Sequence, residues 1–123
     1  MFQSKVSWKD GMAFEAELEG LRFGIDADPE LGGRGLGPKP KGLLLTSLVG
    51  CTGMDVIAIL AKMRLRPTRF EVSAEGMLAD DHPRSFTRIV IRYQLEGELP
   101  PNKVDRAVRL SEAAVAAPAA PRK

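Results

Sequence analysis

The residue of this sequence best suited to chemistry is its single cysteine, Cys51, within the run GCTGMD at residues 50–55. One thiol cannot form a disulfide within the chain, and it is too few to hold a structural zinc ion. Cys51 is therefore either a small buried side chain or a reactive thiol. The first alternative is common, because free cysteine is among the most buried residue types. Each flanking glycine costs a helix about 1 kcal/mol relative to alanine, which indicates that another group approaches closely here.

A reactive Cys51 would need a cation beside it, because the thiolate is the nucleophile and a position in mid-helix gains little from the helix dipole. Arg34, in a glycine-rich loop just before the expected helix, is the best placed by sequence to supply that charge. The alternative for Arg34 is a solvated loop arginine. Asp55 lies on the same helical face as Cys51, four residues further on, where a carboxylate disfavours a thiolate; we therefore expect a structural role for Asp55.

Other site chemistries find little support in the residues. The only histidine, His82, precedes a proline in a charged turn, where we expect a solvated side chain rather than a catalytic base. With one histidine and one cysteine on separate elements, neither a cysteine protease nor a serine triad can be assembled. The run GRGLG at residues 33–37 fits no dinucleotide fingerprint and precedes no Gly-Lys-Ser/Thr. We expect instead a mobile loop that delivers Arg34, and neither cofactor nor metal.

Composition limits the partners and the compartment. The chain has 123 residues, 44% hydrophobic and 28% charged, which is ordinary for one soluble globular domain. Its 18 basic and 16 acidic residues are mixed without a basic stripe, so we expect no nucleic-acid partner. The N-terminus lacks the apolar core of a signal peptide, and the uncharged run from Gly42 to Met54 is too short to span a bilayer. We expect a cytoplasmic protein without a membrane partner, since a lone thiol stays reduced there.

The elements that position these residues follow from periodicity and turn signals. Three segments that alternate apolar and polar residues, separated by Asp-Gly and Glu-Gly turns, predict an antiparallel meander over residues 5–26. A helix is expected from Lys41 to Arg64, ending before Pro67. A second hairpin then pairs Arg69–Leu78 with Ser85–Leu95, and a last helix begins near residue 103.

The order of these elements, β-β-β-α-β-β-α, predicts an α+β fold with an antiparallel sheet curled around the central helix. We expect one domain over residues 1–112, followed by a frayed Ala/Pro-rich tail over residues 113–123. The central helix is apolar nearly all round, and a small domain can rarely bury such a helix alone. Small residues such as Gly50 and Gly53 would let another backbone come close. Both features predict a core shared with a second subunit.

The sequence resembles the osmotically inducible protein C and organic hydroperoxide resistance (OsmC/Ohr) family, and within it the YhfA-like branch. The resemblance extends from about residue 5 to residue 112. The runs that carry it are GGRGLGP at 32–38, LLL at 43–45, GCTGMDV at 50–56, IL at 59–60 and AVRLSE at 107–112.

The resemblance implies an intertwined homodimer in which each subunit's strands wrap the other's central helix. It also implies that a first cysteine, matched by Cys51, attacks an organic hydroperoxide and becomes a sulfenic acid. In the family, a second cysteine on the last helix then closes a disulfide that a dithiol reductant reopens. An arginine, for which Arg34 is the candidate, and a glutamate hold the thiolate.

The sequence departs from this family pattern in three places. Counting along the last helix puts the second cysteine at Ala116, and alanine cannot resolve a sulfenic acid. The family's glutamate falls at Gly42, and the Ala/Pro tail replaces a C-terminal strand. We therefore predict at most a weak one-cysteine peroxidase that depends on an external thiol. The alternative is a non-catalytic dimeric module that binds a small apolar ligand at the subunit interface, with Cys51 as a relic.

Overall fold

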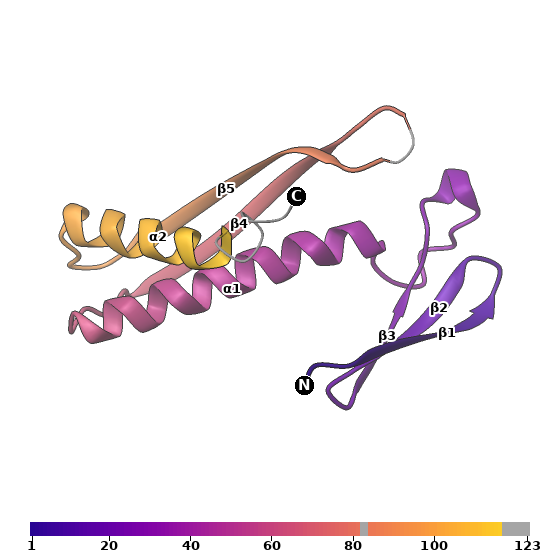
Figure 1. Cartoon of the computed structure of the whole chain (residues 1–123), viewed down its shortest axis with the longest axis horizontal. Coiled ribbons are helices and arrows are strands. Elements are labelled where there is room, and N and C mark those ends of the chain that lie inside the picture. The colour runs from indigo at the N-terminus through magenta and orange to yellow at the C-terminus, as the bar shows by residue number, and fades with distance from the viewer. Residues whose placement is uncertain (82–83, 117–123) are drawn as a thin grey trace. The chain divides into compact units, whose positions relative to one another are not determined.

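The computed structural model describes residues 1–81 and 84–116, with side chains described as far as Ala113. His82 and the tail residues 117–123 therefore lie outside the described residues. The chain divides into two compact units, Met1–Leu44 and Leu45–Lys123. The order of regular elements is the predicted β-β-β-α-β-β-α of an α+β fold, and every strand pair is antiparallel (Figure 1). Within the described residues, the strands form two sheets, one of three strands and one of two.

The N-terminal unit contains the predicted meander, in the order β1 (Ser4–Asp10), β2 (Ala13–Leu18) and β3 (Leu21–Ile25). Because successive side chains of a strand alternate between faces, the register gives this sheet one apolar and one charged face. The charged face carries Lys5, Lys9 and Arg22 in ion pairs with Glu15 and Glu17. The apolar face is formed by Val6, Trp8, Phe14, Ala16, Leu18, Leu21, Phe23 and Ile25.

The glycine-rich segment after β3 contains a short 3-10 helix, η1 (Pro29–Leu31), that the sequence did not predict. The central helix α1 follows as Pro40–Lys62, with the proline at its first position, where a missing N–H costs nothing. The helix ends in a Schellman turn, in which Arg64 takes a φ of 60° and the N–H of Leu65 donates to the Leu60 carbonyl at 2.9 Å.

The C-terminal unit packs α1 and α2 (Pro101–Ala116) against the hairpin of β4 (Arg69–Leu78) and β5 (Phe86–Glu96) (Figure 1). Its fully buried core is formed by Val56 and Leu60 of α1 and Ala107 of α2. Around that core pack Ile59, Met63, Leu65, Phe70, Tyr93, Leu95 and Val108. Thr52 is the third buried residue of α1 and lies on the same face as Val56 and Leu60. Packing within the unit therefore fixes which face of α1 points to its interior.

Candidate functional site

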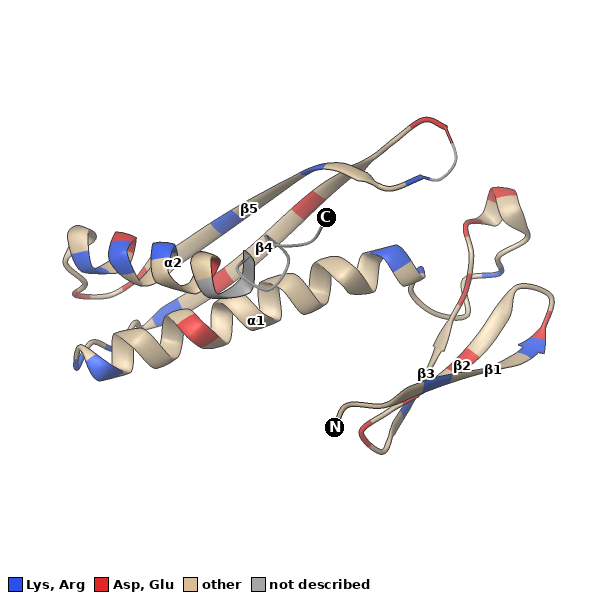
Figure 2. Cartoon of the chain, in the orientation of Figure 1, with Lys and Arg blue, Asp and Glu red and all other residues tan. Residues whose placement is uncertain are grey.

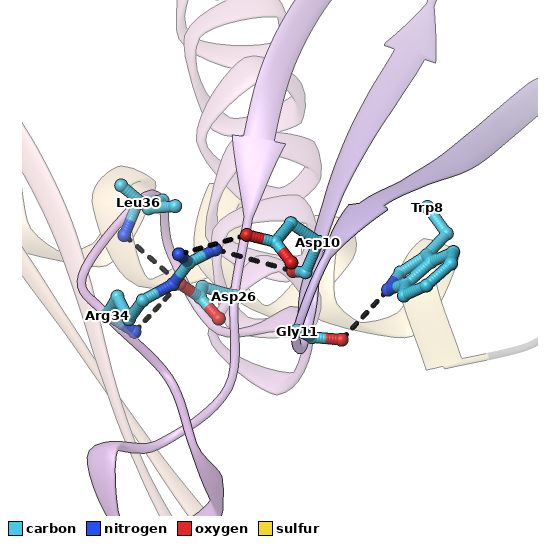
Figure 3. Close-up of polar contacts among 6 residues, drawn as sticks. All are labelled: Trp8, Asp10, Gly11, Asp26, Arg34 and Leu36. Carbon is cyan, nitrogen blue, oxygen red and sulfur yellow. Dashed lines mark hydrogen bonds and ion pairs between the residues drawn. The ribbon is translucent and has the colours of Figure 1, made fainter.

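The loop that carries Arg34 is organised by a residue that the sequence analysis did not single out, Asp26. This aspartate directly follows β3 and is only 3% exposed. Its carboxylate accepts three backbone N–H groups, from Ala27 at 2.8 Å, Arg34 at 3.0 Å and Leu36 at 3.3 Å. Its own N–H donates to the Pro38 carbonyl at 3.1 Å. The loop that the sequence predicted to be mobile is thus pinned to the end of β3 (Figure 3).

These hydrogen bonds also govern the charge of Asp26. The N–H donated by Arg34, followed by that of Ala27, holds the pKa of the Asp26 carboxyl below its ordinary value, while burial opposes the change. Hydrogen bonds to the charged form of a carboxyl favour that form. Asp26 is therefore an anion at neutral pH. The sequence signal that could have found it is an aspartate directly after an alternating strand and at the start of a Gly/Pro loop, where aspartate commonly bonds nearby backbone N–H groups.

The glycines of this loop allow the backbone to approach itself closely. A Cβ atom at Gly33 would lie 1.7 Å from the Ala27 carbonyl oxygen, and one at Gly37 would lie 2.0 Å from that of Gly24. Both distances are far inside van der Waals contact, so only glycine fits without movement of the backbone. The N–H groups of Arg34 and Leu36, which could face a phosphate in a cradle, are instead taken by Asp26.

The side chain of Arg34 reaches the β1–β2 turn. Its Nη1 lies 3.3 Å from Oδ2 of Asp10, and its Nη2 donates to the Asp10 carbonyl at 3.4 Å (Figure 3). In the same turn, the Gly11 carbonyl accepts a hydrogen bond from Nε1 of Trp8 at 2.8 Å. The Arg34 and Asp10 side chains are 50% and 76% exposed. An ion pair so exposed to solvent contributes little to stability, so another anion can replace Asp10 at modest cost.

Cys51 lies on α1 and is exposed. Within the described residues the chain itself does not bury Cys51, and the choice between the two alternatives that the sequence left open stays a prediction. A Cβ at Gly50 would meet nothing within 4 Å among the described residues, and one at Gly53 would meet Cγ2 of Val72 at an ordinary 3.5 Å. Nothing in this part of the chain thus explains the cost of the glycine beside the thiol.

The residue after the thiol, Thr52, is buried beside a cluster of hydroxyl groups from β5 and α2. Thr52 is 1% exposed and donates to the Val49 carbonyl. The Tyr93 hydroxyl donates to Oε2 of Glu112 at 3.0 Å, and the buried Ser111 hydroxyl donates to the Val108 carbonyl at 2.8 Å. Burial raises the pKa of Tyr93, and Glu112 adds to the effect. The turn of α1 that carries Cys51 thus places Thr52 in the interior of the unit, while the thiol beside it is exposed.

Arg34 and Cys51 belong to different units of the chain, and their pairing stays a prediction. Gly42, where the family pattern has a glutamate, lies in the first turn of α1, and Ala116 ends α2. Within residues 1–81 and 84–116, no three His, Cys, Asp or Glu side chains gather in a way that could hold a metal ion.

Comparison with known proteins identifies the family to which this chain belongs. The model of the family described as OsmC-like protein matches residues 32–115. The chain belongs to the OsmC-like family. It is 32% identical to Protein YhfA of Escherichia coli K12 over 111 residues, which cover 89% of this chain and 80% of YhfA. The resemblance to the YhfA-like branch is thereby confirmed.

Solved structures share the fold of this OsmC-like chain at lower identity. A hypothetical protein from Aquifex aeolicus superposes with a TM-score of 0.80 at 22% identity, covering 96% of this chain and 88% of its own. An organic hydroperoxide resistance protein OsmC from Legionella pneumophila superposes with a TM-score of 0.72 at 16% identity, covering 93% and 83%. At these identities the likeness establishes the fold alone.

Proposed function

We propose that this OsmC-like chain is a thiol protein whose Cys51 is oxidised by organic hydroperoxides, and that it is at most a weak one-cysteine peroxidase. The observation that carries the proposal is the exposure of the only thiol, on a central helix of a chain of this family. A thiol that its own chain leaves exposed can meet a substrate at a subunit interface, whereas a cysteine buried in the core of its own chain is inert. The name of the Legionella pneumophila protein, organic hydroperoxide resistance protein, points to the same class of substrate.

The proposed reaction consumes one hydroperoxide and two external thiols. The Cys51 thiolate attacks one oxygen of the O–O bond; an S–O bond forms, the O–O bond breaks and the alkoxide leaves as the alcohol after taking a proton. The resulting sulfenic acid condenses with an external thiol to a mixed disulfide and releases water. A second external thiol then attacks the external sulfur, which restores Cys51 and releases a disulfide.

Two residues decide how far this reaction goes. Arg34 is our candidate for the cation that favours the thiolate, and its weak, exposed pairing with Asp10 leaves the guanidinium open to a change of partner. Ala116, at the end of α2, stands where the family pattern places the second cysteine. With no second thiol in the chain, the sulfenic acid has no internal partner. We therefore expect the reaction to stop after one event unless an external thiol is present.

The proposal includes an intertwined homodimer. Of the 23 residues of α1, only Thr52, Val56 and Leu60 are buried, while Met54 is 76% exposed. In the N-terminal sheet, Trp8 on the apolar face is 66% exposed. Exposed apolar surface of this extent is typical of an interaction site. We propose that the strands of one subunit cover α1 of the other, which also explains the small residue Gly50.

The other environment that could cover α1 is a lipid bilayer, because by length and composition this helix is able to cross one. Figure 2 shows α1 charged only near its ends and at one position between them, Asp55. An aspartate near the centre of a spanning helix costs about 2.5–3.5 kcal/mol. A protein partner that contacts Asp55 through polar groups avoids that cost. We therefore propose a dimer in the cytoplasm, where the thiol stays reduced.

The test is mass spectrometry of the intact protein after one equivalent of cumene hydroperoxide, without reductant. We expect the mass to rise by one oxygen atom, and by two under excess hydroperoxide as the sulfinic acid forms. The Cys51→Ser variant, which changes only the sulfur, should show neither product. An unmodified wild-type thiol would contradict the proposal and would favour the non-catalytic ligand-binding module.

A further inference from the structure

The carboxylate of Asp26 is buried at the start of the Arg34 loop, and the proposed thiol chemistry does not use it. Burying a charge costs a great deal unless hydrogen bonds compensate the lost hydration. Three backbone N–H groups do so here, from Ala27, Arg34 and Leu36, at 2.8 to 3.3 Å. A carboxylate held by this number of charge-assisted hydrogen bonds is fixed in place, and it fixes its donors in turn.

The donors form a concave anion-binding turn. Arg34 and Leu36 both donate to Oδ2, and between them Gly35 takes the left-handed φ of 73°. Backbone N–H groups around such a residue point into a common concavity that suits an anion. In this protein the anion is supplied by the chain itself, eight residues before Arg34 (Figure 3).

The head group of Arg34 is held much less firmly than its backbone. Among the described residues, the guanidinium makes long contacts, at 3.3 and 3.4 Å, with the exposed residue Asp10. Arg34 therefore combines a backbone fixed by a buried anion with a head group that can exchange partners.

We propose that Asp26 is the positioning residue of Arg34: its carboxylate fixes the backbone at position 34, so that the guanidinium is presented from one place. The link to reactivity rests on the proposed function, in which Arg34 serves the Cys51 thiolate. The fixing of the loop does not depend on that function, so the two can be tested separately.

Native-state cleavage by trypsin at the Arg34–Gly35 bond, followed by mass, measures the fixing directly. We expect Asp26→Asn and Asp26→Ala to be cleaved there at least about tenfold faster than wild type, because cleavage follows the population of the open loop. The matched control is Asp28→Asn, two residues away, where the carboxylate pairs with Lys39 at the surface. This control should be cleaved like wild type.

Small anions provide a rescue that would not occur if Asp26 acted other than as an anion in the turn of backbone N–H groups. Formate should slow cleavage of Asp26→Ala, because it can enter the vacated turn and accept the same N–H groups, whereas chloride at equal ionic strength should not. If the variants do not fold, hydrogen exchange of the Arg34 and Leu36 amides in wild type tests instead whether Asp26 holds these N–H groups. Exchange as fast as in an unstructured peptide would overturn the proposal, as would wild-type cleavage in the folded variants or the absence of formate rescue.

The reactivity arm measures alkylation of Cys51 at pH 7. We expect Asp26→Asn and Arg34→Ala to slow it to a similar extent, and the double variant to be no slower than Arg34→Ala. Additive losses, or slowing by Arg34→Ala alone, would overturn the positioning role. Failure of wild-type Cys51 to react with hydroperoxide would count against the proposed function only. The rate of cleavage at Arg34–Gly35 would still test whether Asp26 fixes the loop.

Discussion

Two anions are partners for the Arg34 guanidinium: the Asp10 carboxylate, which it contacts, and the Cys51 thiolate, which we propose as its second partner. Both Arg34 and Asp10 are largely open to solvent, where a single ion pair contributes about 0–1 kcal/mol. A difference of that size does not commit the guanidinium to Asp10. Single substitutions can therefore shift Arg34 between its partners without unfolding the protein.

We predict that Arg34→Ala slows alkylation of Cys51 by iodoacetamide at pH 7 about threefold to tenfold, because a nearby cation favours the reactive thiolate. Asp10→Asn should have the opposite effect, since it removes the competing anion. The control is Arg22→Ala, which removes an arginine of the same unit that pairs with Glu15 and Glu17. Equal alkylation rates in wild type and Arg34→Ala would mean that Arg34 does not act on the Cys51 thiolate.

We predict that Asp26 makes stability depend on pH in acid. The folded protein lowers the pKa of this carboxyl, so its contribution is complete above the unfolded value of about 3.9 and is lost as the pH falls through the folded value. The difference in unfolding free energy between wild type and Asp26→Asn should be constant near neutral pH and shrink below about pH 4. Urea unfolding at a series of pH values measures it, and a difference that grows in acid would be the wrong sign.

The elements around the site use glycine for two opposite reasons. In the loop, Gly37 lies against the Gly24 carbonyl and has no room for a side chain. In α1, a Cβ at Gly42 would meet nothing within 4 Å among the described residues. The same residue type is thus required by packing at one position and is a cost to the helix at the other.

We predict that Gly37→Ala lowers the unfolding free energy by about 1–3 kcal/mol, as overpacking typically does. Gly42→Ala, the matched substitution, should raise it by up to about 1 kcal/mol through helix propensity. Chemical unfolding followed by circular dichroism measures both. A Gly37→Ala protein as stable as wild type would mean that the loop has more freedom than its contacts with β3 allow.

Helix α2 is joined to β5 through Tyr93 and Glu112, in addition to the apolar packing around Ala107. We predict that a double-mutant cycle of Tyr93→Phe and Glu112→Gln gives a coupling energy of about 0.5–1.5 kcal/mol, the usual net contribution of a hydrogen bond. Arg109→Gln, which breaks only the surface pair with Asp105, is the control and should show no coupling with Tyr93→Phe. A coupling energy of zero would mean that apolar packing alone holds α2.

At the scale of the whole molecule, the two units leave apolar faces uncovered. The apolar face of the N-terminal sheet exposes Trp8, and α1 exposes Met54. A stable dimer that covered such faces would bury more than about 2,000 Å². Cys51 lies on the same helix, so its surroundings in solution depend on this association.

We predict that light scattering at micromolar concentration gives the mass of a dimer. Met54→Lys should weaken it strongly, because a charge replaces an apolar contact in the proposed interface. Gln94→Lys, which adds the same charge to an exposed position of β5, should leave the dimer intact. A folded wild-type monomer at that concentration would contradict the dimer proposal.

The sequence by itself determined the order of the elements and most of their bounds. Alternation over the meander, the apolar run of α1 and the turn residues between strands are local signals, and each reports on the conformation of its own segment. The family followed from runs of adjacent residues, and Cys51 as the candidate reactive residue followed from the same runs. The start of α1 at Pro40 and the turn η1 were missed, because short turns and helix ends depend on individual backbone hydrogen bonds.

The tertiary structure decided what surrounds the site residues. Asp26 and Arg34 meet across a loop, Arg34 and Asp10 are 24 residues apart, and Tyr93 and Glu112 are 19 apart. No local pattern encodes such pairs, because the pairing depends on how the backbone returns on itself. The exposure of Cys51 has the same origin: which side of an all-apolar helix faces solvent is set by the elements that pack on its other side, here β4, β5 and α2.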